Sequence, residues 1–187
     1  MEALLVSAGA VALAEIGDKT QLLALVLAAR FRAPIPVILG IFTATLANHL
    51  AAGAAGTLLA AYISAAVMRW ALALSFFGTA LWVFIPEREP EGQARASRFG
   101  AYGSTTLSFF IAEIGDKTQI VTVALAARYQ ELFAVVSGTT LGMLIADVPA
   151  VLLGKLAAER LPVALMHRVA AVVFVVLGVL VLLEVKL

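Results

Sequence analysis

Long apolar stretches alternate with short polar segments along almost the whole chain. Six stretches are long enough to cross about 30 Å of hydrocarbon as helices, and they cover approximately residues 3–28, 35–60, 69–85, 105–127, 132–154 and 164–185. The one long polar segment, residues 86–104, is rich in proline, glycine and charge, which is typical of a connector. The pattern predicts an all-α membrane protein with three transmembrane helices in residues 1–85 and three in residues 105–187.

Composition supports this class. Hydrophobic residues make up 63% of the 187 positions and charged residues 13%, which is too apolar for a water-soluble domain. The net charge of +1 gives no general attraction to nucleic acid, so no nucleic-acid partner is expected. The chain has no cysteine, which excludes thiolate metal sites and disulfides. No resident cofactor is expected, and any metal ion must be held by oxygen or nitrogen.

Basic residues are distributed unevenly between the two sides of the predicted bundle. The loops after the first, third and fifth spans carry eight of them: Arg30, Arg32, Arg88, Arg95, Arg98, Lys155, Arg160 and Arg168. The opposite side carries three: Arg69, Arg128 and Lys186. Because cytoplasmic loops are enriched in Lys and Arg, the connector is predicted to be cytoplasmic and both termini to lie outside. The first span begins with Met1-Glu2 rather than a basic segment, so we expect a permanent helix and not a cleaved signal.

The chain contains an internal duplication. The seven residues Glu15–Gln21 (EIGDKTQ) recur letter for letter as Glu113–Gln119, a shift of 98 positions, and the sequence LAAR recurs at the same shift. Each half is predicted to hold an odd number of spans, so the second copy must enter the membrane from the opposite side. The duplication therefore predicts two inverted three-helix repeats, an arrangement in which transporters bind substrate where the repeats meet.

Both copies of the motif place charged residues deep inside an apolar span. At 1.5 Å per residue, Glu15 lies about 18 Å and Glu113 about 14 Å from the start of its span. A charge there costs about 2.5–3.5 kcal/mol if it faces lipid, so the acids must face an interior. Residues i and i+3 share a helix face, which places Glu15 beside Asp18 and Glu113 beside Asp116. We expect the four carboxylates to meet, balanced by a divalent cation or by protons.

The other motif positions are candidate ligands or ion-pair partners. Lys19 and Lys117 each follow a glutamate by four residues, near enough to pair with a carboxylate. Gly17 and Gly115 permit a local break in the helix that would free backbone groups. The remaining polar positions point away from the acidic face of a straight helix and become ligands only if the helix unwinds: Thr20, Gln21, Thr118 and Gln119.

A second polar group is predicted on the helices that follow the motifs. Thr45, Asn48 and His49 share one helix face, and Asp147 is the positional counterpart of His49 in the second half. Histidine titrates near neutrality and an intramembrane acid is functional by default. Asn48, His49 and Asp147 are therefore candidates for a proton relay, the alternative for His49 being a packed, hydrogen-bonded core residue.

The predicted donor set indicates the kind of ion. Carboxylate, hydroxyl and amide oxygens suit Ca²⁺, Mg²⁺ or Mn²⁺, and His49 shifts the preference toward Mn²⁺. The same carboxylates take up protons when the cation leaves, so one site can serve both ions in an antiport cycle.

The doubled motif resembles the signature E-x-G-D-[KR]-[TS], present in both halves of the Gdt1 family, also called UPF0016. The resemblance covers essentially the whole chain and favours a prokaryotic member. It implies a cation/proton exchanger that moves Mn²⁺, and in many members Ca²⁺, out of the cytosol, with the motif acids as ligands. These correspond here to Glu15, Asp18, Glu113 and Asp116. The implied location is the plasma membrane, where the exporter relieves manganese excess.

Two other functions fit parts of the pattern. One is an exporter of an organic or amino-acid cation. The other is an intramembrane aspartyl protease, because Gly-Asp motifs can supply paired aspartates, although a protease has no use for a glutamate three residues before each one. The expected partners are a divalent cation, protons and the lipid bilayer, and the sequence leaves the oligomeric state open.

Overall fold

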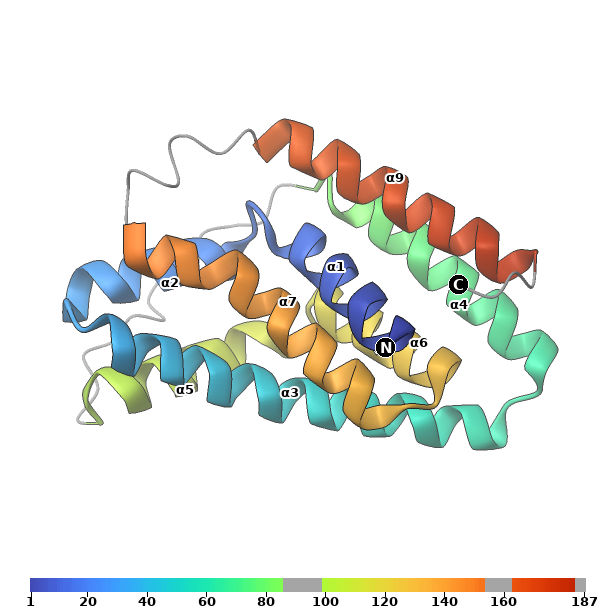
Figure 1. The fold of residues 1–187 in the computed structure, drawn as a ribbon, viewed down its shortest axis with the longest axis horizontal. Coiled ribbons are helices and arrows are strands. Elements are labelled where there is room, and N and C mark those ends of the chain that lie inside the picture. The colour runs from blue at the N-terminus through green and yellow to red at the C-terminus, as the bar shows by residue number, and fades with distance from the viewer. Residues whose placement is uncertain (86–98, 154–162, 184–187) are drawn as a thin grey trace.

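The computed structural model describes residues 1–85, 99–153 and 163–183, and every element in these ranges is a helix (Figure 1). The helices are α1 (Glu2–Glu15), α2 (Lys19–Phe31), α3 (Pro34–Tyr62), α4 (Ala65–Trp82), α5 (Gly100–Glu113), α6 (Lys117–Tyr129), α7 (Leu132–Leu153) and α9 (Val163–Leu182). Two of them, α3 and α7, are long and apolar enough to cross a membrane on their own, and α4 and α9 contain shorter apolar stretches. The predicted all-α class is confirmed for the described residues.

Both motif-bearing segments are interrupted. The expectation of continuous helices over residues 3–28 and 105–127 is wrong, because α1 ends at Glu15 and α2 starts at Lys19, and α5 and α6 are separated in the same way. At the breaks, Gly17 has φ 82° and Gly115 has φ 76°. These are left-handed conformations that glycine adopts at little cost. Glu15 and Asp18 therefore lie on two sides of a break and do not share the face of one straight helix.

The duplication in the sequence is repeated in the backbone. Helices α5 and α6 have the bounds of α1 and α2 shifted by 98 residues, and α7 and α9 begin at the shifted starts of α3 and α4. Even the helix ends match: α2 is followed by Arg32 with φ 49° and α6 by Gln130 with φ 54°. Within the described ranges, each half thus comprises a broken helix followed by two further helices.

The two halves interlock through close helix contacts. Helix α1 packs along α7 from the other half, and α5 packs along α3 (Figure 1). Glycines allow the approach: a Cβ atom added at Gly138 would lie 2.4 Å from the Leu4 carbonyl oxygen, and one at Gly40 would lie 2.9 Å from the Tyr102 carbonyl oxygen. Tyr102 is Leu4 shifted by 98, as Gly138 is Gly40 shifted by 98, so the same contact is made twice.

Helices α4 and α9 form a pair at one end of the molecule, where Figure 1 shows them side by side. The rings of Phe76 and Phe174, which are counterparts at the 98-residue shift, stack with centroids 6.3 Å apart. This pair closes the core on the side away from α2 and α5.

Side chains are distributed as in a protein surrounded by lipid. Large apolar side chains on several helices are exposed, among them Leu39, Leu81 and Phe133, whereas ionisable groups such as Glu15 and Asp147 are fully buried. In water, such broad apolar surface would be an association hazard. In a bilayer this surface faces the acyl chains, and the ionisable groups are kept away from them inside the bundle.

Part of the predicted connector is helical. Helix α5 begins at Gly100, so residues 100–104 belong to it and the predicted connector boundary at 104 is wrong. Packing against α3 explains this, since the Tyr102 hydroxyl lies 3.1 Å from the Thr43 hydroxyl. Residues 86–98, 154–162 and 184–187 lie outside the described residues. With them lie six of the basic residues used to predict orientation: Arg88, Arg95, Arg98, Lys155, Arg160 and Lys186.

The glycine contacts give a stability test. Gly138→Ala pushes a methyl group into the Leu4 carbonyl and should lower the free energy of unfolding by about 1–3 kcal/mol. Gly9→Ala is the matched control, because nothing lies within 4 Å of the added Cβ and alanine favours a helix by about 1 kcal/mol over glycine. Unfolding followed by circular dichroism in detergent should rank Gly9→Ala at or above the unmodified protein and Gly138→Ala below it. Equal stability of the two variants would contradict the packing described.

Candidate cation site

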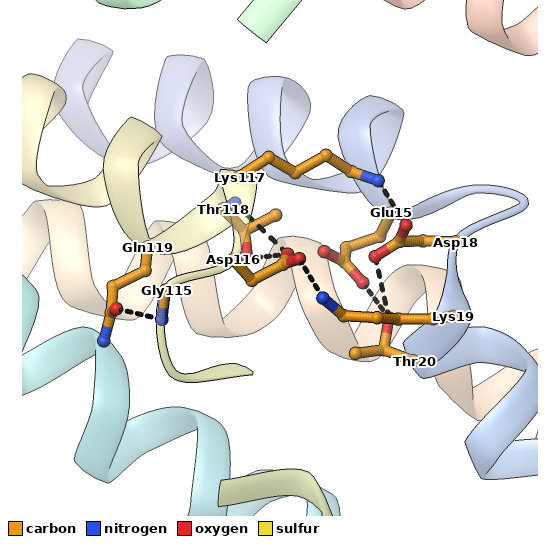
Figure 2. Close-up of polar contacts among 9 residues, drawn as sticks. All are labelled: Glu15, Asp18, Lys19, Thr20, Gly115, Asp116, Lys117, Thr118 and Gln119. Carbon is orange, nitrogen blue, oxygen red and sulfur yellow. Dashed lines mark hydrogen bonds and ion pairs between the residues drawn. The ribbon is translucent and has the colours of Figure 1, made fainter. Parts of the chain in front are cut away.

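The two helix breaks lie against each other inside the bundle and bring three acids together. One oxygen atom from each of Glu15, Asp18 and Asp116 lies within 4.8 Å of the others, and the three residues are at most 2% exposed. Figure 2 shows the Glu15 carboxylate between Asp18 of the first half and Asp116 of the second. Acidic groups 98 positions apart in the sequence thus share one buried space.

Two lysines cross between the halves to reach these acids. The Lys19 ammonium lies 2.7 Å from Asp116 Oδ1, and the Lys117 ammonium pairs with Asp18 Oδ1 (Figure 2). Both lysines were expected to pair with a carboxylate; in the structure each reaches the aspartate of the other half and not the glutamate of its own motif. The break explains this, because it removes the i, i+4 relation between Glu and Lys.

The motif threonines hydrogen-bond to the acids. The Thr20 hydroxyl donates to Glu15 Oε2 and lies 3.4 Å from Asp18 Oδ2, and the Thr118 hydroxyl donates to Asp116 Oδ2 at 3.2 Å. Each threonine therefore fixes the direction of an acidic group next to the break.

The motif glutamines brace the breaks. The Gln21 side-chain oxygen accepts a hydrogen bond from the Gly17 N–H at 3.0 Å, and Gln119 does the same for Gly115 at 2.8 Å. A helix break leaves backbone N–H groups without partners, and these side chains satisfy one in each half. The Gln21 amide also donates to the Ala146 carbonyl at 3.0 Å, which ties the first break to α7.

The fourth motif acid has a different environment. Glu113 Oε1 accepts a hydrogen bond from the Thr45 hydroxyl at 2.5 Å, and Oε2 accepts one from the Asn48 amide at 3.1 Å. Both donors belong to α3, and Asn48 also donates to the Phe110 carbonyl. Four carboxylates were expected to meet, but the structure brings three within ligand distance of one another and places Glu113 against α3.

One carboxylate oxygen of Glu15 accepts no hydrogen bond from the described residues. Its Oε2 accepts from Thr20, whereas Oε1 is buried and has no hydrogen-bond partner among the described residues. A buried polar atom left without a partner costs about 1–3 kcal/mol, and such an atom in a native structure needs an explanation. A bound cation provides one.

His49 and Asp147 flank the acids, one from each half. Both are fully buried, and neither the two ring nitrogens of His49 nor the two oxygens of Asp147 have a hydrogen-bond partner in the part of the chain that the structure describes. The Asp147 carboxylate interacts electrostatically with Glu113, Asp18 and Glu15, and His49 interacts with Asp116. His49 is packed, but the hydrogen bonds of an ordinary core histidine are missing.

A cavity of about 260 Å³ reaches this region, lined by Gly17, Asp18, Val83, Phe84, Ile85, Lys117 and His167. Residues 83–85 are the last described residues before the connector, so the cavity lies at the connector end of α4. His167, near the start of α9, hydrogen-bonds to the Ile16 backbone at the first break. Sequence reasoning missed His167 because its counterpart at the 98-residue shift is Arg69 and no motif marks it.

Comparison with known proteins agrees with the geometry. A family described as "Divalent cation/proton antiporter GDT1" matches the chain over residues 3–91 and 101–187, which takes in both motifs.

The chain belongs to the GDT1 family. It is also similar to a Vibrio cholerae serotype O1 protein named "Putative manganese exporter", with 48% identity over 179 residues that cover 95% of this chain and 89% of that protein. No solved structure matches the chain. The resemblance drawn from the doubled motif is therefore confirmed, and GDT1 membership makes the chain one of a family of cation transporters.

The crossed ion pairs differ in burial, and this difference is testable. The Lys117 side chain is 4% exposed and that of Lys19 is 24% exposed. Breaking a buried pair by removing one partner costs about 3–5 kcal/mol, so Lys117→Gln should lower the free energy of unfolding by that amount in the absence of divalent ions. Lys19→Gln should have the smaller effect, because solvent screens its ammonium group.

Unfolding in detergent with EDTA, repeated with Mn²⁺, measures both effects. Mn²⁺ should restore more stability to Lys117→Gln than to the unmodified protein, because it supplies the positive charge that the variant lacks. Equal losses in the two variants, or no gain from Mn²⁺, would contradict the assigned pairs.

Proposed function

We propose that this GDT1 protein exports Mn²⁺ from the cytoplasm in exchange for protons, with Ca²⁺ as a second substrate, and that Glu15, Asp18 and Asp116 hold the cation. The observation that carries the proposal is the group of three buried carboxylates, contributed by both halves, in which one oxygen of Glu15 has no hydrogen-bond partner in the described ranges. Oxygen donors of this kind suit Mn²⁺ and Ca²⁺. The name of the Vibrio cholerae relative favours manganese.

Charge balance supports exchange of the cation for protons. Three acids face two lysines, so one negative charge is left over, and a divalent ion would compete with the ammonium groups for the same oxygens. Like charges this close cannot all remain ionised once the cation leaves. We assign the returning protons to these carboxylates and propose that His49 and Asp147, which are buried and have no hydrogen-bond partner among the residues that the structure describes, pass the protons on.

An aspartyl protease fits the site poorly. A protease dyad consists of two aspartates that share one proton. Here Asp18 and Asp116 each form an ion pair with a lysine of the other half, so they are not a dyad in which each aspartate has only the other as its close partner.

We propose that the chain crosses the membrane six times as two inverted three-helix repeats, with α1 and α2 forming one span and α5 and α6 another. Discontinuous helices that meet near the midplane are typical of transporters with inverted repeats. The 98-residue shift in helix bounds and the exchange of packing partners between α1 and α5 support this arrangement. The proposed orientation in the plasma membrane has both termini outside and the connector in the cytoplasm, so the cavity beside Asp18 opens the site to the cytoplasm.

Transport tests the ligands. In proteoliposomes, an imposed proton gradient should drive Mn²⁺ flux, and Glu15→Gln, Asp18→Asn and Asp116→Asn should each lower it at least about tenfold, since even partners outside a ligand set cost about 10- to 100-fold when removed. Glu131→Gln neutralises an exposed acid at the start of α7 and serves as the control. Mn²⁺ flux that does not depend on the proton gradient, or that persists in the three variants, would refute the proposal.

Thiol labelling tests orientation and access. The chain has no native cysteine, so single cysteines report cleanly. His167→Cys places a thiol in the cavity, on the side proposed to be cytoplasmic. Tyr62→Cys places one at the carboxyl end of α3, on the side proposed to lie outside. A membrane-impermeant maleimide should label position 167 in inside-out vesicles and position 62 in intact spheroplasts. The reverse pattern would invert the proposed topology, and no labelling of position 167 from either side would contradict access through the cavity.

A further inference from the structure

The two motif glutamates are equivalent in sequence and unequal in environment. Both oxygens of Glu113 accept hydrogen bonds from α3, at 2.5 Å from Thr45 and 3.1 Å from Asn48. Among the described residues, Glu15 receives a hydrogen bond on one oxygen only, and its other oxygen is buried without a partner there. The duplication itself does not explain this difference, because the seven motif residues are identical in the two halves.

The difference lies in the helix that faces each glutamate. The 98-residue shift converts Thr45 to Met143 and Asn48 to Ala146. Neither a thioether nor a methyl group donates a hydrogen bond. Met143 is fully buried in the same apolar cluster as Val11 and Ala14, two residues of α1 close to Glu15 in the sequence. At these positions α7 therefore offers an apolar surface, whereas α3 offers two hydrogen-bond donors.

The register of the helices makes these positions equivalent in space as well as in sequence. Helix α5 approaches α3 at Gly40 through Tyr102 and Thr105, and α1 approaches α7 at Gly138 through Leu4 and Ser7, which are the same contacts shifted by 98 residues. From these anchors to the glutamate both helix pairs run for the same number of residues. Positions 143 and 146 therefore face Glu15 as positions 45 and 48 face Glu113.

We propose that these two replacements divide the work between the glutamates. Thr45 and Asn48 are positioning residues that hold Glu113 against α3, and the lack of side-chain donors at positions 143 and 146 of α7 leaves Glu15 free to bind the cation. The exchanger then has one divalent-cation site, displaced toward the first half, and not two equal sites. This inference rests on the proposed function and adds which glutamate binds.

Transplanting the donors tests it. The double variant Met143→Thr/Ala146→Asn offers Glu15 the same two donors that hold Glu113. Mn²⁺ affinity of the purified protein, measured by calorimetry or by loss of the free Mn²⁺ resonance signal, should fall about 10- to 100-fold. The matched control is Met143→Val/Ala146→Leu, which introduces side chains of nearly the same shapes without donors and should bind within a few fold of the unmodified protein. Equal weakening in the two variants, or unchanged affinity in the donor variant, would overturn the inference.

A second pair of variants keeps the inference falsifiable if the double variants fold poorly. Glu15→Gln removes the free ligand, whereas Glu113→Gln alters a residue held away from the cation. Mn²⁺ affinity should fall at least about tenfold more in Glu15→Gln than in Glu113→Gln, because loss of even a residue that only supports a ligand lowers metal affinity by about 10- to 100-fold. Both variants should bind at most one ion. Equal losses would restore the symmetric picture of two equivalent glutamates.

The unmodified protein separates this inference from the function on which it rests. If it does not bind Mn²⁺ at all, the proposed function fails and the inference fails with it. If it binds Mn²⁺ with unit stoichiometry and the donor variant binds equally well, only the division between the glutamates is wrong.

Discussion

The mutual repulsion of three buried carboxylates is the constraint on which the rest of the structure depends. Glu15, Asp18 and Asp116 lie together in a core that large apolar side chains surround. In a medium of low dielectric constant such a group is tolerated only when positive charge accompanies it. Lys19 and Lys117 provide that charge across the boundary between the halves, so neither half can balance its own acids. The ion pairs thereby link charge balance to the way in which the halves fit together.

The backbone is arranged to deliver these groups. Gly17 and Gly115 turn the chain out of the helix at the same level in both halves, and Gln21 and Gln119 satisfy the amides that the turns expose. Glycines elsewhere bring α1 onto α7 and α5 onto α3, so that the two turns face each other. Under the proposed function, a cation that displaces the lysines would change the interactions between the halves at the place where they meet.

The all-α fold class, the internal duplication and the motif acids could be predicted from the sequence, because the length of the apolar stretches and a repeated motif can be read directly along the chain. The partners of those acids could not. Pairing of Lys117 with Asp18 depends on how two distant breaks are juxtaposed, and the straight-helix assumption pointed to the wrong neighbour. The different roles that we propose for the two glutamates are nevertheless visible in the sequence. They appear when the two halves are compared for positions that differ, such as Thr45 against Met143, and not only for positions that match.

The central claim is that one divalent cation sits between the two helix breaks. Anomalous scattering from crystals soaked with Mn²⁺ tests it most directly. The account predicts a single strong peak within about 2.0–2.6 Å of carboxylate oxygens from both halves, at the distances usual for hard divalent ions, with Glu15 among the ligands. Two equal peaks, a peak held by one half alone, or a peak only at the aqueous surface would contradict it.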